Sequence, residues 1–132
     1  MRILIAEDDE TCSMILESMF KPYGTSVVVA DGEAAIRAVT TELVKQQPFD
    51  LICLDIMMPG LDGQACLRCI RAIEQGFGRV GGAGTQILMT TALNAPESIL
   101  SAFRSQCEGY LVKPIDRVKL TDQLSKLGFF PA

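Results

Sequence analysis

Histidine and tryptophan are both absent from this sequence of 132 residues. Without histidine, the chain has no Ser–His or Cys–His nucleophile, no histidine metal ligand and no phosphohistidine intermediate of its own. Long apolar runs are missing too. The longest have four residues, whereas a membrane span needs about 20 and a secretory signal about 7 or more. We therefore expect neither a membrane segment nor a membrane partner.

Positive charge is scarce. Lysine and arginine total 12 against 16 aspartates and glutamates, which gives a net charge of −4 and a pI near 4.8. No basic run offers a nucleic-acid footprint, so we expect no direct binding of DNA or RNA. The length and the 48% apolar and 21% charged content are those of one ordinary globular domain, expected over residues 1–132. Whether this domain stands alone or belongs to a longer protein is left open.

The five cysteines are an odd count without framework-like spacing: Cys12, Cys53, Cys66, Cys69 and Cys107. The spacing of Cys66 and Cys69 is the one suggestive pair. Zinc takes four ligands, and a redox pair follows a strand-to-helix turn, whereas this pair lies inside a helical pattern. We predict buried structural thiols rather than a metal or redox pair, in a reducing, cytoplasmic compartment.

Five segments have the apolar or β-branched character of strands: Arg2–Ala6, Ser26–Ala30, Phe49–Leu54, Gln86–Thr91 and Gly109–Val112. A helical pattern follows each of them. Continuous apolar strands are typical of burial on both faces. The alternation therefore predicts an α/β fold, a doubly wound five-stranded parallel sheet with helices on both faces.

The helices are predicted from apolar stripes at helical spacing. The stripes are Cys12-Ile15-Leu16-Met19-Phe20, Ile36-Val39-Leu43, Leu67-Ile70-Ile73, Ile99-Leu100-Phe103 and Leu120-Leu124-Leu127. Asp31 is a candidate N-cap, Asp9 and Glu10 form a solvated helix start, and Asn94 and Pro96 are start signals for the fourth helix. Gln75–Gly84 contains five glycines and predicts a long loop.

Polar side chains follow the predicted strands where those strands end. Glu7 and Asp8 follow the first, Asp55 the third and Lys113 the fifth, and Thr91 closes the fourth. In a doubly wound sheet, ligands bind beyond the carboxyl ends of the strands, so these groups are expected to converge. Crowded carboxylates need a cation, and oxygen ligands favour Mg²⁺ or Mn²⁺. The set suits phosphoryl transfer to an aspartate.

Four motifs stand at these strand ends in order: ILIAEDD (3–9), DIMMPGLDG (55–63), MTTA (89–92) and GYLVKP (109–114). Together they resemble the receiver domain of two-component response regulators, over nearly the whole chain. The resemblance implies a flavodoxin-like sheet with strand order 2-1-3-4-5. It also implies that a sensor histidine kinase or a histidine phosphotransfer protein donates the phosphoryl group. A downstream protein target or effector domain would receive the signal.

By this resemblance, Asp55 is the phosphoacceptor. Asp8 and Asp55 are direct Mg²⁺ ligands, and Glu7 acts mainly through water. The backbone carbonyl of Met57 completes the protein ligands. Mn²⁺ is a possible substitute for Mg²⁺ at such a site.

The remaining implied roles concern the phosphoryl group and the conformational switch. Thr91 donates its hydroxyl, Ala92 offers a backbone N–H, and Lys113 forms an ion pair across a cis bond to Pro114. Tyr110 is either the switch aromatic or an ordinary core or surface aromatic. The output surface is then the fourth helix, the fifth strand and the fifth helix.

The sequence departs from typical receivers in one place: the spacing from Asp55 to Thr91 is several residues longer, because of Gln75–Gly84. A competing class is a Mg²⁺-dependent phosphatase or phosphomutase with an aspartyl nucleophile. Such enzymes usually carry a second acid two residues after the nucleophile, where this chain has Met57. A passive binding module would lack one of the key residues. We therefore expect a phosphoacceptor that assists its own phosphorylation and dephosphorylation, and not an enzyme.

Overall fold

A computed structural model describes residues 1–58, 60–79, 84–92 and 107–132, and it contains a five-stranded parallel sheet in the order β2-β1-β3-β4-β5. The strands are β1 (Arg2–Ala6), β2 (Thr25–Val29), β3 (Leu51–Asp55), β4 (Gln86–Thr91) and β5 (Gly109–Val112). The predicted bounds of β1, β4 and β5 are confirmed. β2 lies one residue earlier than expected, and β3 starts two residues later and includes Asp55.

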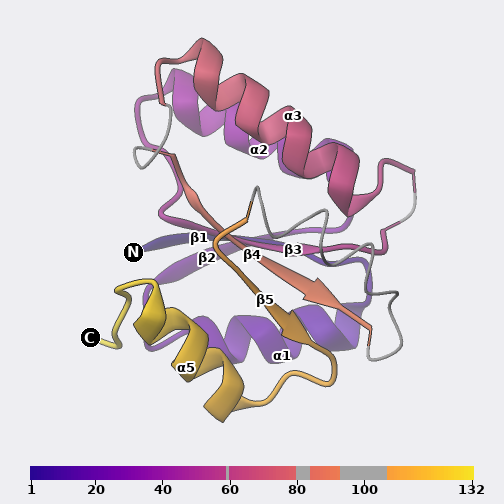
Figure 1. The fold of residues 1–132 in the computed structure, drawn as a ribbon, viewed down its shortest axis with the longest axis vertical. Coiled ribbons are helices and arrows are strands. Elements are labelled where there is room, and N and C mark those ends of the chain that lie inside the picture. The colour runs from indigo at the N-terminus through magenta and orange to yellow at the C-terminus, as the bar shows by residue number, and fades with distance from the viewer. Residues whose placement is uncertain (59, 80–83, 93–106) are drawn as a thin grey trace.

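Among the described residues, two helices cover each face of the sheet. Figure 1 shows α2 (Gly32–Val44) and α3 (Gly63–Gly76) on one face, and α1 (Glu10–Phe20) and α5 (Arg117–Lys126) on the other. This is the doubly wound, flavodoxin-like architecture that the sequence predicts. The helix expected after β4, with its start at Asn94 and Pro96, falls in residues 93–106, outside the described residues. No helix among the described residues is long and apolar enough to cross a membrane.

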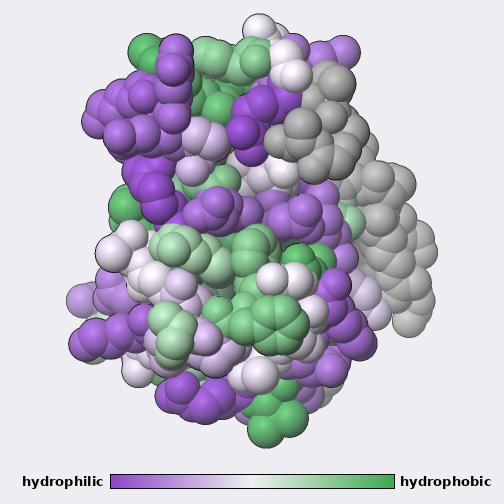
Figure 2. Space-filling model, turned by 90° about the vertical axis from the view of Figure 1, so that its left-hand side faces the viewer, coloured by the Kyte–Doolittle hydropathy of each residue, from purple (hydrophilic) through white to green (hydrophobic). Residues whose placement is uncertain are grey.

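Alternate side chains of the strands enter two separate apolar cores. In β1, Leu4 and Ala6 pack in the core under α2 and α3, whereas Ile3 and Ile5 pack in the core under α1 and α5. Successive side chains of a strand point to opposite faces, so a strand buried on both sides must be apolar throughout. At the end of the molecule that carries both termini, further apolar surface gathers over the half occupied by α1 and α5 (Figure 2).

The expectation of burial on both faces is wrong for β2. Val27 is 47% exposed and Val28 is 38% exposed. The reason is the strand order, which puts β2 at one edge of the sheet. The apolar composition of β2 looks like that of a central strand. Only the tertiary arrangement shows that β2 is an edge strand.

Aspartates begin all four described helices. The N-caps are Asp9, Asp31, Asp62 and Asp116, and each side chain accepts a hydrogen bond from the backbone N–H three residues later. Such a cap stabilises a helix by about 1 kcal/mol. The predicted cap at Asp31 and the predicted helix start at Asp9 and Glu10 are confirmed. Those at Asp62 and Asp116 were not predicted.

The predicted loop at Gln75–Gly84 starts later than expected, because α3 continues through Gly76. Gly78 then adopts φ +80°, the left-handed conformation that commonly ends a helix. Glu74, which is buried, accepts hydrogen bonds from Arg71 at 2.8 Å and from the Thr85 N–H at 2.6 Å. These contacts fix the end of α3 to the start of β4. Residues 80–83 of the loop lie outside the described residues.

The prediction of buried thiols is only partly correct. All five cysteines are free, but only Cys53 and Cys66 are buried. Burial raises the pKa of both thiols to about 12. Cys69 is exposed, because it lies beside the buried stripe of α3 and not in it; that stripe runs through Gly63, Cys66, Leu67, Ile70 and Glu74. Cys12 and Cys107 are half-buried.

Candidate functional site

The carboxyl ends of four strands bring the predicted polar residues together. Asp55 closes β3 and pairs with Thr90 in the register of β3 and β4. Glu7 follows β1 directly, and Lys113 follows β5 directly. Because the strands are parallel, all of these positions fall at one end of the sheet.

Lys113 connects the two buried carboxylates. Its Nζ lies 2.7 Å from Oε1 of Glu7 and 3.1 Å from Oδ2 of Asp55. Glu7 is 2% exposed and Asp55 is 3% exposed. The other oxygen of Asp55, Oδ1, accepts a hydrogen bond from the backbone N–H of Met57 at 3.1 Å. The carboxylate of Asp55 is therefore held in a fixed orientation from both sides.

Burial and crowded negative charge together determine the electrostatics of the site. Burial and the nearby Asp55 raise the pKa of Glu7, and the hydrogen bond from Lys113 opposes this only in part. Burial by itself lowers the pKa of Lys113, but the carboxylates of Glu7 and Asp55 outweigh it, so that the pKa is raised overall. The ammonium is thus held in its charged form by the two groups that it neutralises.

Three carboxylates in this cluster could share a cation. Oxygen atoms of Glu7, Asp8 and Asp55 all lie within 4.8 Å of one another. Glu7 is buried, and its Oε1 forms the ion pair with Lys113. Asp8 is exposed, so the cluster opens to solvent on its side. A set of oxygen donors with one accessible side fits a hard divalent cation that keeps several waters.

Thr91 and Ala92 lie beside this cluster. Thr91 is buried, and its carbonyl accepts a hydrogen bond from the backbone N–H of Lys113 at 2.7 Å, which joins the ends of β4 and β5. The Thr91 hydroxyl lies 3.5 Å from the carbonyl of Ala92. The predicted cis bond between Lys113 and Pro114 is present.

Tyr110 is half-buried and packs against the core under α2 and α3. It pairs with Met89 in the register of β4 and β5, two positions from Thr91. This position is compatible with a switch aromatic and with an ordinary packed aromatic, so both predictions for Tyr110 stand.

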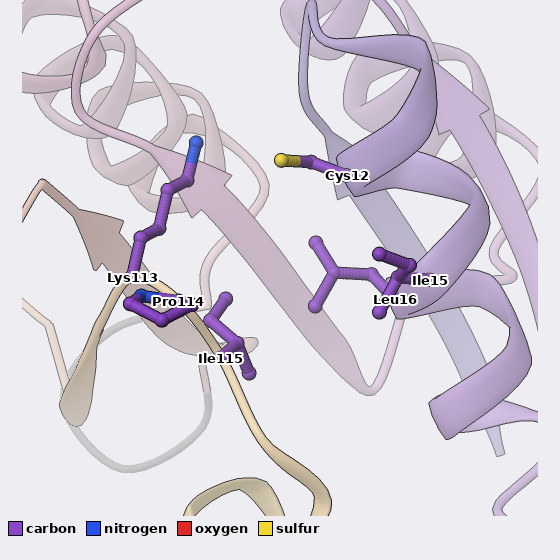
Figure 3. A pocket seen from close by; sticks show the side chains of 6 residues that line it. All are labelled: Cys12, Ile15, Leu16, Lys113, Pro114 and Ile115. Atoms are coloured by element: carbon purple, nitrogen blue, oxygen red, sulfur yellow. The ribbon is translucent and has the colours of Figure 1, made fainter.

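A small apolar pocket of about 100 Å³ opens beside Lys113. Figure 3 shows side chains of α1 on one side of it and the segment after β5 on the other: Cys12, Ile15 and Leu16 against Lys113, Pro114 and Ile115. Ile15 is 46% exposed. The charged site is therefore bordered by an accessible apolar surface.

Comparison with known proteins agrees with this geometry. A family model described as the response regulator receiver domain matches residues 3–125. The chain belongs to this family. As a receiver domain, it shares its fold with many solved structures, and its curated relatives include two kinds of protein.

One kind is a transcriptional regulator and the other a sensory protein. The transcriptional activator PfeR of Pseudomonas aeruginosa is 35% identical over 120 residues, which are 90% of this chain and 35% of PfeR. The sensory/regulatory protein RpfC of Xanthomonas campestris is 26% identical over 128 residues, which are 97% of this chain and 16% of RpfC. This receiver domain therefore spans about a third or less of these relatives.

Among solved structures, the receiver domain of the sensor histidine kinase PA1611 from Pseudomonas aeruginosa is 29% identical, with a TM-score of 0.75. The match covers 96% of this chain and 97% of that one. That structure carries a magnesium ion coordinated in its active-site cleft.

Sequence reasoning missed two features of the site. The first is the N–H of Met57, which holds Asp55, whereas the prediction concerned the carbonyl of Met57. The second is the apolar pocket, whose lining comes from segments about 100 residues apart. The sequence offered no clear signal for the pocket. Ile15 belongs to the apolar stripe of the first helix, which predicts core packing, whereas the structure leaves it 46% exposed.

Proposed function

We propose that this receiver domain accepts a phosphoryl group on Asp55 and changes conformation in response. The observation that carries the proposal is the carboxylate of Asp55, buried at the end of β3 and held by Lys113 and by the N–H of Met57. A carboxylate fixed in this way beside a cation is suited to attack an activated phosphorus atom.

The reaction transfers the phosphoryl group from a phosphohistidine to the aspartate. A new bond forms between a carboxylate oxygen of Asp55 and phosphorus, and the bond between phosphorus and the donor's imidazole nitrogen breaks. The electron pair of the broken bond stays on that nitrogen, which then takes up a proton. The product is an aspartyl phosphate, and the charge on its phosphoryl oxygens increases the demand for nearby positive groups.

Mg²⁺ is the cofactor that we propose, with Mn²⁺ as a substitute. Glu7, Asp8, Asp55 and the backbone carbonyl of Met57 would hold it. The close oxygens of the three side chains support this assignment. When bound, the ion supplies charge neutralisation for the carboxylates and for phosphoryl oxygens. The magnesium seen in the related PA1611 receiver is consistent with it.

The other residues act on the phosphoryl group directly. Lys113 pairs with a phosphoryl oxygen, Thr91 donates its hydroxyl, and Ala92 offers its backbone N–H. The 2.7 Å bond from the N–H of Lys113 to the carbonyl of Thr91 makes these two residues move together. A displacement of Thr91 then reaches β5 and Tyr110.

We propose a sensor histidine kinase or a histidine phosphotransfer protein as the donor, and a protein target or effector domain as the recipient of the signal. A donor that brings its imidazole to Asp55 must cover the surface beside Lys113 at the carboxyl ends of the strands. The apolar pocket between α1 and Ile115 gives such a protein a place for an apolar side chain. A cytoplasmic location and the absence of nucleic-acid and membrane partners remain predictions from the sequence.

The direct test is phosphorylation by acetyl phosphate, followed by intact mass spectrometry. We expect the protein to gain one phosphoryl group with Mg²⁺ present and none in a chelator. The aspartyl linkage is confirmed by its loss in hydroxylamine. No gain of mass under any condition would refute the proposal.

Mg²⁺ is expected to stabilise the unphosphorylated protein. At about ten times its dissociation constant, a ligand that binds only the folded state adds about 1.4 kcal/mol, or a few degrees in Tm. Thermal melts in Mg²⁺ and in chelator measure the shift. We expect Asp8→Ala to reduce it strongly and Asp122→Ala, at an exposed aspartate of α5, to leave it unchanged. An equal shift in both variants would place the ion elsewhere.

An aspartyl-nucleophile phosphatase is the competing function. Its proton-transfer acid would occupy the position of Met57, whose side chain is 69% exposed and cannot transfer a proton. We therefore propose a phosphoacceptor that assists its own phosphorylation and dephosphorylation, and not an enzyme with a separate substrate.

A further inference from the structure

The outer edge of β2 has free backbone groups. The N–H of Thr25 donates to the carbonyl of Met1 at 3.1 Å, and the carbonyl of Val29 accepts from the N–H of Glu7 at 3.0 Å. With the two-residue period of a strand, Thr25, Val27 and Val29 thus turn their backbone groups toward β1. Ser26 and Val28 turn theirs away from the sheet. Within the described part of the chain, β2 pairs with β1 alone.

This edge lacks the usual protection against strand pairing. Exposed edge strands commonly carry lysine, proline, a bulge or an inward-pointing charge. Thr25–Val29 has the sequence TSVVV, which contains no charged residue, no proline and no glycine. Its register with β1 runs through all five residues without a bulge. Val27 and Val28 remain partly open to solvent, at 47% and 38% exposure.

We propose that two copies of this chain pair through β2, antiparallel, around a two-fold axis at Val27. In this register, Ser26 of one copy faces Val28 of the other. Each such pair exchanges two N–H to carbonyl hydrogen bonds, which makes four in all. Val27 then lies opposite its own counterpart in a non-hydrogen-bonded pair, where side chains come closest. An interface of this kind is self-complementary.

The same two-fold rotation at Val27 brings the two α1 helices side by side. α1 contacts both β1 and β2, so it lies over the edge of the sheet. An open groove of about 640 Å³ runs between α1 and the start of β2, lined by Met14, Glu17, Ser18, Lys21, Gly24, Thr25 and Ser26. Met14 is 63% exposed beside it. Strands about 4.8 Å apart would place the helices at an ordinary packing distance.

Charge complementarity favours a second copy as the occupant. Glu10, Met14, Glu17 and Lys21 share one stripe of α1, with the acid Glu10 at its start and Lys21 at its C-cap. The two-fold axis reverses the second helix, so Lys21 of each copy meets Glu10 of the other. Neither residue has an ion-pair partner among the described residues.

The interface is small, so we expect a weak dimer with a dissociation constant on the order of 100 µM. Sedimentation velocity at protein concentrations up to about 1 mM measures this dissociation constant.

Val27→Lys puts two ammonium groups on the axis and is expected to weaken association at least tenfold. The matched control is Val118→Lys, the same change at a 79% exposed valine of α5, which should leave association unchanged. Circular dichroism melts check that both variants fold.

Charge exchange gives a second, independent test. Glu10→Lys and Lys21→Glu should each weaken the dimer, and the double variant should restore it. Both changes oppose the dipole of α1, so restored association cannot come from a more stable helix. A wild-type protein that stays monomeric at about 1 mM would overturn the proposal. So would a dimer that survives Val27→Lys, or a double variant no better than either single one.

Amide exchange locates the interface directly. The N–H groups of Ser26 and Val28 should exchange up to about fivefold more slowly at about 1 mM than in dilute protein, because about a fifth of the chains are still monomeric at that concentration. The N–H of Val27, which faces β1, should be protected at both concentrations. Protection of Ser26 and Val28 that does not depend on concentration would contradict pairing between copies. The proposal uses no residue of the phosphorylation site, so its outcome is separate from that of the proposed function.

Discussion

Replacing Asp55 by asparagine is expected to abolish phosphorylation by acetyl phosphate while the fold is kept. The amide has the same shape, but it is not a nucleophile. It also removes one of the crowded negative charges near Glu7, so the folded state should not lose stability. Intact mass spectrometry with Mg²⁺ present should show the gain of one phosphoryl group in the wild type and none in the variant.

The matched control is Asp62→Asn. Asp62 is an exposed aspartate that caps α3 through a 2.8 Å hydrogen bond from the N–H of Ala65. Asparagine caps helices about as well as aspartate, so this variant should fold and label fully. Full labelling of Asp55→Asn would move the phosphoacceptor to another residue and refute the assignment.

Loss of the Lys113 ammonium is expected to have the second large effect. In Lys113→Ala, the buried carboxylates of Glu7 and Asp55 lose the cation that lies 2.7 and 3.1 Å from them. Removing one partner of a buried ion pair costs about 3–5 kcal/mol, and we expect about 2–3 kcal/mol here, because the Lys113 side chain is 25% exposed. Urea unfolding in a chelator measures this loss. Mg²⁺ should then stabilise the variant more than it stabilises the wild type.

The same variant tests the coupling of the site to β5. With beryllofluoride as a mimic of the phosphoryl group, amide spectra of the wild type should change around Asp55, Tyr110 and α5. In Lys113→Ala the changes should stay near Asp55. Lys119→Ala, at a 57% exposed lysine side chain of α5, should behave like the wild type in both experiments. Changes that still reach Tyr110 in Lys113→Ala would show that Lys113 is not the coupling element.

The two variants separate chemistry from transmission. Asp55→Asn removes the oxygen that we propose forms the new bond, so every later event should be lost with it. Lys113→Ala keeps that atom and removes the proposed contact between the phosphoryl oxygens and β5. A protein that labels normally but fails to change at Tyr110 would locate the start of the signal at Lys113.

Local rules in the sequence determined most of the elements. The apolar runs of β1 and β4 predicted their bounds residue by residue, because a strand buried on both faces is mostly apolar. The bounds of β5 were predicted as well, although it lies at the other edge of the sheet and only Leu111 in it is buried. Asp31 marked the start of α2 through a hydrogen bond that spans only three residues. The strict alternation of strands and helices determined a parallel sheet with helices on both faces.

The strand ends also determined which residues meet. Parallel strands all end on one side of the sheet, so Glu7, Asp55 and Lys113 converge without any knowledge of distances. The structure then supplied what the sequence could not, namely the ion pairs of Lys113 and the N–H of Met57 that fix Asp55. These contacts depend on side-chain rotamers and on the turn after β3, which no periodicity encodes.

Exposure was decided by tertiary structure alone. The run of valines in β2 is as apolar as a central strand, yet it lies at the edge, because strand order follows from how the helices cross over the sheet. The exposure of Cys69 was also decided by the fold, because Cys69 lies beside the stripe of α3 that packs in the core. Sequence patterns describe what a segment can bury. Which neighbour covers it is a property of the whole fold, because burial requires a second surface that lies elsewhere in the chain or on another copy.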